Sequence, residues 1–173
     1  MPAKPALNGK AVTASLFLST TAFVVTADLL TKWLAFRSIE RGGSIRVIGG
    51  FLDLIHVENP GAVFGIGQGK QTFFILFTFV AAAGLIWAAW KYGRSSRFLT
   101  FGLGCVLGGA LGNLWDRLFI GTVRDFIYCH IGSFHWYVFN LADAAICVGA
   151  GALILCAYWP SAARREAAST KSP

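Results

Sequence analysis

The feature that most constrains this chain is one uninterrupted apolar run. Residues 72–90 are 19 consecutive positions without a charged side chain, and Trp87 and Trp90 stand near the end of the run. A transmembrane helix needs roughly 20 predominantly apolar residues. Tryptophan is enriched at membrane–water interfaces. The run therefore predicts a membrane-spanning helix.

Three further apolar runs cover residues 11–36, 98–115 and 138–159. Hydrophobic residues make up 55% of the chain and charged residues only 13%, which departs from the average of soluble domains towards a membrane protein. We therefore expect an all-α membrane protein, with residues 1–173 forming a single integral-membrane domain of four transmembrane helices.

The first run also has features of a secretory signal peptide. A basic, polar start precedes the apolar stretch, and Val25-Thr26-Ala27 is a loose small-residue cleavage pattern. The apolar character resumes after Asp28, so the run is long enough to span if it stays whole. We expect a retained helix.

Basic residues predict the orientation. Lys91, Arg94 and Arg97 crowd the short loop between the second and third runs, which should therefore be cytoplasmic. The total count of Lys and Arg, 8 inside and 7 outside with that loop included, barely favours this orientation. The net charge of +7 comes from no dense basic cluster, so no nucleic-acid binding is expected. The resulting topology has cytoplasmic tails at 1–10 and 160–173, and extracytoplasmic loops at 37–71 and 116–137.

The segment 37–71 carries strand and turn signals. Gly49-Gly50 separates two β-rich stretches, 44–48 and 51–57, which predicts a hairpin. A turn signal follows at 58–61, and the glycine-rich stretch 61–69 is expected to be flexible. It lacks the Lys-Ser/Thr ending of a phosphate-binding P-loop. We expect a small extracytoplasmic β-hairpin or sheet that rests on the membrane surface.

Small residues predict how the helices pack. Gly104, Gly108 and Gly112 recur every four positions, so one helix face is nearly bare and another helix can approach closely. Ala145 and Gly149 offer a similar face in the last run.

The cysteines and histidines show no metal-binding spacing, so neither a metal ion nor another cofactor is expected. Cys105, Cys147 and Cys156 lie in apolar runs and are expected to be small buried residues. His130 and His135 are expected to flank a loop, with solvated or interfacial roles.

Two aspartates suggest chemistry. Asp125 follows the third apolar run and Asp143 stands just inside the fourth, so both carboxylates should lie at the same membrane face. Each acidic group at membrane depth costs about 2.5 kcal/mol or more, which makes a functional role the default hypothesis. Adjacent carboxylates share a proton: one can activate water and the other can protonate the reacting group. The spacing alone equally allows Asp143 to be a helix-start residue beside the dipole, and Asp125 a plain loop residue.

Other polar residues have two interpretations each. Asp28 and Lys32 are four residues apart, which fits a local ion pair with Lys32 snorkelling to the interface, or support for a site in the bundle. Asn113, Asp116 and Arg117 share a helix face, which fits an ion pair at the water boundary or a cluster that orients a site.

Two further functions compete with hydrolysis. Asp28, Asp125 and Asp143 could form a proton or cation relay of a transporter, but the polar residues gather at one face and residues 72–90 offer only Thr78 as a polar relay group. A small scaffold protein would leave the polar cluster unexplained.

Five sequence blocks, in this order and at this spacing, resemble the lipoprotein signal peptidase family, also called signal peptidase II. They cover about residues 15–160 and read Asp28-Leu-Leu-Thr-Lys32-Trp33, Glu58-Asn59-Pro60-Gly61-Ala62-Val63-Phe64, Gly108-Gly109-Ala110-Leu111-Gly112-Asn113-Leu114-Trp115-Asp116-Arg117, Gly121-Thr-Val-Arg-Asp125-Phe126 and Phe139-Asn140-Leu141-Ala142-Asp143.

The resemblance implies a monomeric aspartic endopeptidase of the bacterial inner membrane, with four spans, both termini cytoplasmic and the active site near the extracytoplasmic face. Its substrates would be prolipoproteins whose lipobox cysteine already bears diacylglycerol, cut just before that cysteine, beside membrane lipid. It makes Asp125 and Asp143 the catalytic pair, and implies a short helix and loop in 118–137. It also implies substrate-binding or support roles for Asp28, Lys32, Asn59, Gly61, Asn113, Arg117, Asn140 and Ala142.

Overall fold

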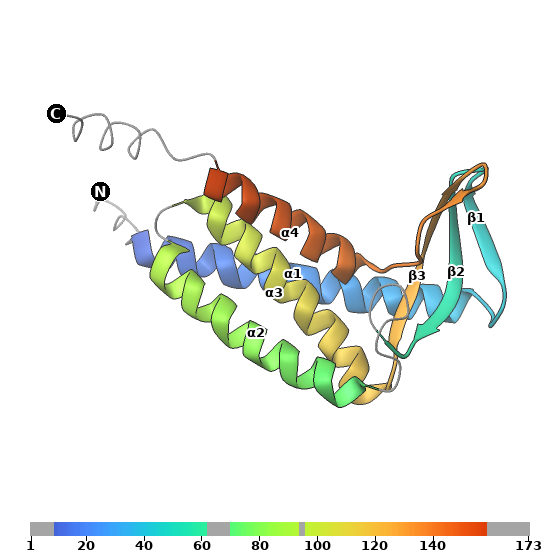
Figure 1. The fold of residues 1–173 in the computed structure, drawn as a ribbon, viewed down its shortest axis with the longest axis horizontal. Coiled ribbons are helices and arrows are strands. Elements are labelled where there is room, and N and C mark those ends of the chain that lie inside the picture. The colour runs from blue at the N-terminus through green and yellow to red at the C-terminus, as the bar shows by residue number, and fades with distance from the viewer. Residues whose placement is uncertain (1–8, 62–69, 94–95, 159–173) are drawn as a thin grey trace, which may run out of the picture.

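The computed structural model describes residues 9–61, 70–93 and 96–158 (Figure 1). The flexibility expected of 61–69 falls almost entirely outside these residues, as does most of both tails. Helices and strands follow one another as α1 (Gly9–Ser38), β1 (Ser44–Ile48), β2 (Leu52–Asn59), α2 (Gln71–Tyr92), α3 (Arg97–Phe119), β3 (Val123–Ile131), β4 (Phe134–His135) and α4 (Leu141–Tyr158).

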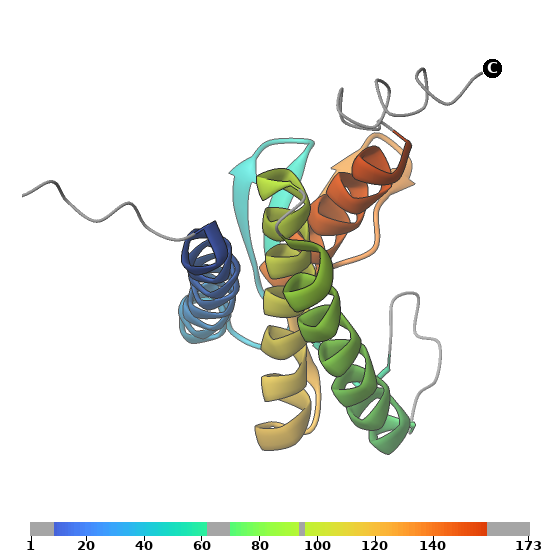
Figure 2. The same cartoon turned by 90° about the vertical axis from the view of Figure 1, so that its left-hand side faces the viewer.

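All four helices are long and apolar enough to cross a membrane, as predicted. α1 runs without a break through Ala27 and Asp28, in agreement with a retained first span. α3 is the central helix: it is mostly buried and packs against α1, α4 and α2, as the end-on view shows (Figure 2). α2 is the least buried of these helices, with Thr78 and Ala82 as its buried residues, and its exposed side is the surface that lipid would cover.

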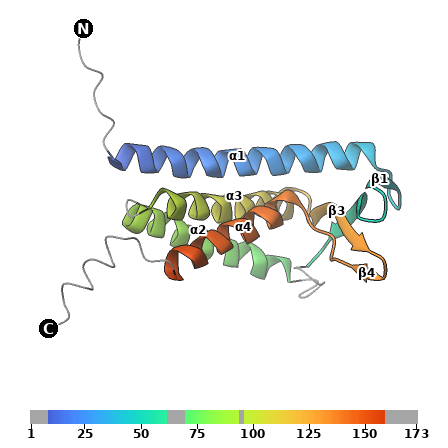
Figure 3. The ribbon, with the colours of Figure 1, turned by 90° about the horizontal axis from the view of Figure 1, so that it is seen from above.

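Two glycine faces of α3 allow this packing. A Cβ atom at Gly108 would lie 2.7 Å from the Cβ of Val24 on α1, so only glycine permits the observed approach, and Gly104 faces α1 in the same way. On the other side of α3, Gly102 faces the backbone of Gly149 on α4. The predicted close-packing faces are therefore confirmed. Figure 3 shows α1 running beside the other helices over their full length.

The predicted hairpin is confirmed as β1 and β2, but the sheet is larger than expected. Its strand order is β1-β2-β3-β4, with every neighbouring pair antiparallel. The short helix and loop expected in 118–137 are wrong, because this segment forms the two strands that complete the sheet. It is rich in β-branched and aromatic residues, and it pairs with the otherwise open edge of β2. His130 and His135 consequently face each other across β3 and β4.

The expected burial of the cysteines holds only for Cys105. Cys147 is exposed and Cys156 half-buried on α4. The prediction failed because the outer face of a membrane helix is as apolar as its inner face, so an apolar run does not reveal which residues point inward.

We predict that Gly108→Ala lowers the free energy of unfolding by about 1–3 kcal/mol, because the new methyl group would overlap Val24 and the backbone of Thr21. Gly84→Ala on the exposed surface of α2 is the matched control, since no atom lies within 4 Å of its Cβ position. It should leave stability unchanged or raise it slightly. Thermal unfolding in detergent measures both, and equal melting temperatures for the two variants would contradict the packing described.

Candidate active site

Asp125 and Asp143 line the same cavity. They belong to β3 and to the start of α4, which come together where the sheet joins the bundle (Figure 1). Asp125 belongs to β3 and is 1% exposed, whereas Asp143 lies in the first turn of α4 and is half-buried. The main-chain N–H groups of Phe126 and Ile127 donate to the carbonyl of Phe139, at 3.1 and 2.8 Å. These bonds hold the start of α4 against the strand that carries Asp125.

Asn140 joins the two carboxyl groups. Its Nδ2 donates to Oδ1 of Asp125 at 2.7 Å, and its Oδ1 accepts from the main-chain N–H of Asp143 at 3.0 Å. The main-chain N–H of Asn140 in turn donates to Oδ2 of Asp143 at 3.3 Å. This reciprocal arrangement is a capping box of α4. The signal that starts the helix therefore also fixes the spacing of the two acids.

Asn113 on α3 supports the same pair. Its Nδ2 donates to Oδ1 of Asp143 at 2.7 Å, while its Oδ1 accepts from Nδ2 of Asn140 at 3.1 Å. The two asparagines thus form a hydrogen-bonded link between α3, α4 and β3. Carboxamides suit this position, because each supplies both donor and acceptor atoms without adding charge.

Asp125 has a second amide donor on the opposite strand. Nδ2 of Asn59 donates to its Oδ2 at 2.9 Å, and Oδ1 of Asn59 accepts from the N–H of Gly61 at 3.0 Å, which folds residues 59–61 into a local turn. Burial raises the pKa of Asp125 to about 6; the hydrogen bond from Asn59 opposes this rise, and the charge of Asp143 adds to it.

A buried charge network lies directly behind Asn113. Nζ of Lys32 lies 2.7 Å from Oδ2 of Asp28, 2.9 Å from Oδ1 of Asn113 and 3.2 Å from Oδ2 of Asp116. The side chains of Lys32 and both its acidic partners have no exposed surface. Lys32 therefore does not snorkel to the interface, and its pair with Asp28 is not merely local, because it also connects α1 to α3.

The same network reaches the start of α4. Oδ1 of Asp28 accepts from the main-chain N–H of Ala142 at 2.9 Å, and Ala142 itself is completely buried. Gly112 makes room for this contact, since any side chain there would collide with the carboxylate of Asp28. Asp28 thereby restrains the turn of helix that presents Asp143.

Asp116 is a candidate support residue that the family resemblance did not single out. Its carboxylate accepts from the main-chain N–H of Arg124 at 3.0 Å and from Nη2 of Arg124 at 2.7 Å, in addition to pairing with Lys32. Of its two interpretations from sequence, the ion pair at the water boundary is wrong, because Asp116 is fully buried, whereas a cluster that orients a site agrees with these contacts. Its contacts fix the residue immediately before Asp125.

Arg117 closes one side of the site. Its Nη2 donates to the carbonyl of Gly61 at 3.1 Å and its Nη1 to the carbonyl of Asn113 at 3.3 Å. Its guanidinium group lies 5.2 Å from the centre of the Phe74 ring on α2. Arg117 therefore connects α2, α3 and the turn after β2.

The two aspartates open onto one cavity of about 440 Å³. Its lining combines polar side chains with apolar and aromatic ones. The lining comprises Asn59, Gly61, Asn113, Arg117, Val123, Asp125, Trp136, Tyr137, Phe139, Asp143, Ala144 and Cys147. Within residues 9–61, 70–93 and 96–158, no group of three or more His, Cys, Asp and Glu side chains is placed to hold a metal ion.

The site and its support contain one more acid than bases. The carboxylates belong to Asp28, Asp116, Asp125 and Asp143, and the cations to Lys32, Arg117 and Arg124. A single added proton neutralises the cluster, and charge neutrality is strongly favoured where water is excluded. This balance agrees with a carboxylate pair that shares one proton.

Comparison with known proteins gives a consistent result. The family model described as signal peptidase (SPase) II matches residues 20–159. A lipoprotein signal peptidase of Bacillus pumilus (strain SAFR-032) is 40% identical over 135 residues, covering 78% of this chain and 87% of that protein.

Two solved structures of bacterial membrane enzymes, obtained by the in meso method, have similar folds. One, at 2.3 Å resolution, superposes with a TM-score of 0.76 and 32% identity over 90% of this chain and 91% of that chain. The other, at 1.9 Å, gives a TM-score of 0.76 and 31% identity over 84% and 94%.

We predict that Lys32→Met lowers the free energy of unfolding by about 3–5 kcal/mol, because it leaves the buried carboxylate of Asp28 without its cation and removes one of the two cations that pair with Asp116. Arg41→Met is the control: Arg41 pairs with Glu58 at 2.8 Å but its side chain is 81% exposed, so stability should change little. Chemical or thermal unfolding in detergent distinguishes the variants. If Lys32→Met were as stable as Arg41→Met, the network would not hold the helices together as described.

Proposed function

We propose an aspartic mechanism for this chain, which belongs to the signal peptidase II family and is therefore a peptidase that removes signal peptides from prolipoproteins. Asp125 and Asp143 form the catalytic pair and activate water. The observation that carries the proposal is that Asp125 and Asp143 line one cavity and that Asn140 donates to both carboxyl groups, through its side-chain amide to Asp125 and through its main-chain N–H to Asp143.

In this mechanism the pair holds one proton. The ionised carboxylate accepts a proton from a water molecule as the water oxygen attacks the scissile carbonyl carbon, and the protonated carboxyl group donates to the carbonyl oxygen. The resulting tetrahedral intermediate then collapses: the C–N bond breaks as the departing nitrogen takes the proton that came from water, and a hydroxyl group of the intermediate returns its proton to the other carboxylate as the carbonyl group re-forms, which restores the pair. Asp125 is buried and its pKa is raised to about 6, which supports it as the carboxyl group that holds the shared proton near neutral pH.

The cavity also suits a lipid-modified substrate. Among its lining residues, Asn59 and Arg117 can bind peptide main chain, whereas Val123, Phe139 and Cys147 offer apolar contacts. We therefore propose that the substrate is a prolipoprotein whose cysteine already carries diacylglycerol, and that the bond before this cysteine is cut. The chain would act as a monomer in the bacterial inner membrane.

Charge distribution supports an extracytoplasmic active site. Lys91 and Arg97 flank the loop at the far end of the bundle, which the positive-inside rule assigns to the cytoplasm with both tails. The transport alternative is less well supported, because the buried charged side chains among the described residues all belong to the cluster at the sheet end, and Thr78 on α2 donates to its own helix. No charged relay leads from them to the other end within that part of the chain.

Asp125→Asn and Asp143→Asn should each reduce cleavage of a lipid-modified precursor by at least about 10³-fold, because either change removes a proton-transfer group. The assay uses detergent micelles, in which no gradient exists to drive transport. Asp53→Asn is the control, since Asp53 pairs with His130 in the sheet at 3.1 Å and does not line the cavity. Full turnover by either active-site variant, with unaltered unfolding behaviour, would exclude the pair.

The pH dependence of kcat/KM should report the pKa of Asp125. If it supplies the proton, kcat/KM should fall as pH rises through an apparent pKa of about 6 or somewhat higher, because the group is protonated only below its pKa. Asn59→Ala should move this limb to higher pH, since the amide hydrogen bond lowers the pKa of Asp125. A rate that rises continuously from acidic to alkaline pH, or a limb unmoved by Asn59→Ala, would contradict this role.

A further inference from the structure

A second large cavity lies at the opposite end of the bundle from the aspartates. It occupies about 570 Å³ between the beginning of α1 and the end of α2. The residues that line it are Lys10, Thr13, Ala14, Phe17, Leu18, Ile86, Ala89, Trp90 and Lys91. None of them belongs to the cavity that holds Asp125 and Asp143.

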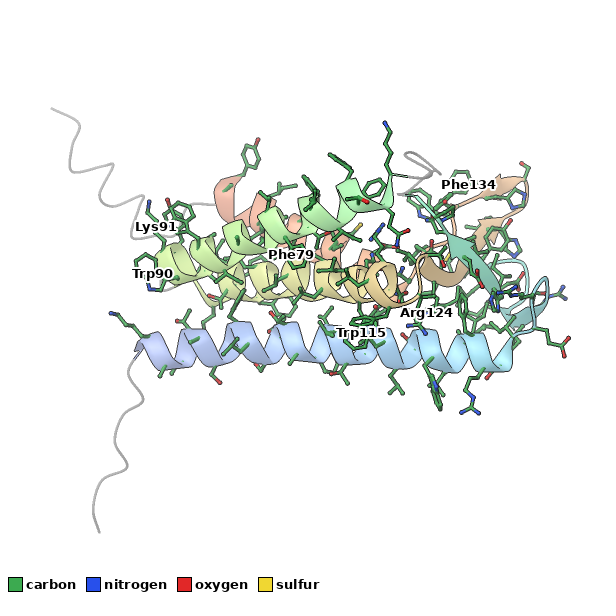
Figure 4. All side chains as sticks on the ribbon, turned by 90° about the horizontal axis from the view of Figure 1, so that it is seen from below. Phe79, Trp90, Lys91, Trp115, Arg124 and Phe134 are labelled. Carbon is green, nitrogen blue, oxygen red and sulfur yellow. The ribbon has the colours of Figure 1, made fainter. Side chains whose placement is uncertain are left out.

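The walls of this groove are apolar, and they face the membrane. α1 packs mainly on α3 and makes few contacts with α2, which leaves Leu18 and Ile86 more than half exposed. Trp90 is 79% exposed, and Figure 4 shows it with Lys91 at the end of α2, on the side where α1 begins. In a bilayer an apolar groove of this size, open to lipid, accommodates an acyl chain.

The mouth of the groove is positively charged. Lys10 comes from α1 and Lys91 from α2. The ammonium group of Lys91 lies 4.7 Å from the centre of the Trp87 ring and 5.1 Å from that of Tyr92, which holds it at the level of an interfacial aromatic belt. The described parts of the four helices carry their aspartates only at the sheet end.

From these observations we infer that the groove is a binding site for an anionic phospholipid. The phosphate lies between Lys10 and Lys91, and an acyl chain follows the apolar walls formed by Phe17, Leu18 and Ile86. Basic side chains at a membrane surface attract anionic lipids, each by a factor of about five. This role is separate from peptide cleavage.

Charge disfavours the other possible occupants. Residues 1–8 include Lys4, and a second copy of this chain that docked through the same surface would place the same lysines against Lys10 and Lys91. Either would bring positive charge to a positive rim. A phospholipid supplies the opposite charge and also the chain that the groove needs.

The test counts lipids retained by the purified full chain in native mass spectrometry, from micelles containing equal amounts of phosphatidylglycerol and phosphatidylcholine. The unaltered chain should retain phosphatidylglycerol preferentially. Lys10→Gln combined with Lys91→Gln should reduce that preference about five- to twentyfold. Arg41→Gln combined with Arg46→Gln is the matched control, because it removes the same charge from exposed side chains at the other end.

A second readout locates the lipid. Phosphatidylglycerol with brominated acyl chains should quench the fluorescence of Trp90 more than brominated phosphatidylcholine does. The contribution of Trp90 is the difference in quenching between the unaltered chain and Trp90→Phe. No preference for the anionic lipid, or an equal loss of preference in both double variants, would overturn the proposal. So would a dimer in the same spectra that occupies the groove, or anionic-lipid binding that appears only after deletion of residues 2–8.

Discussion

The structure depends on an ammonium group that has no contact with water. Lys32 lies within 3.2 Å of two carboxylates and one carboxamide, and these partners come from α1 and α3. A buried charge is tolerated only when it is paired and its hydrogen bonds are satisfied. α1 and α3 must therefore meet at the level of Lys32, and α4 joins them there because Asp28 also accepts from the main-chain N–H of Ala142. The glycines of α3 remove the side chains that would prevent this approach.

The arrangement of the acids follows from this constraint. Asp28 accepts a hydrogen bond from the main-chain N–H of Ala142, the residue before Asp143. Asp116 accepts one from the main-chain N–H of Arg124, the residue before Asp125. Each acid of the proposed pair is thus positioned through the main chain of its neighbour, while Asn140 links the two side chains. A rigid supporting shell is what catalysis by two carboxyl groups requires, because small displacements are costly.

Much of the architecture could be predicted from local sequence. Four apolar runs gave the spans, Gly49-Gly50 gave the hairpin, and the four-residue glycine repeat gave the face on which α1 packs. The contribution of β3 to the sheet could not be predicted, since strand partners are separated by more than sixty residues and pairing depends on which edge is open. The prediction that Cys147 and Cys156 on α4 are buried failed for a different reason: lipid and the protein interior both favour apolar side chains, so sequence does not distinguish them.

The candidate site was accessible mainly through its resemblance to a family. Periodicity allowed Asp28 and Lys32 to be an ordinary helical pair, and nothing local indicated that Lys32 would reach Asn113 on another helix. The shared helix face of Asn113, Asp116 and Arg117 allowed Asp116 a supporting role but did not reveal its partners, because Lys32 and Arg124 lie on either side of it in sequence and neither shares its helix. Such a network becomes visible only when three elements converge.

If Asp125 and Asp143 form the catalytic pair, both must bind the water and the carbonyl group that react. A crystal structure with a peptide analogue that carries a secondary hydroxyl group in place of the scissile carbonyl tests this. We expect this hydroxyl within hydrogen-bond distance of both carboxyl groups, with the apolar substituent along Val123 and Phe139. A hydroxyl bound by neither aspartate, or an analogue bound away from the cavity, would contradict it.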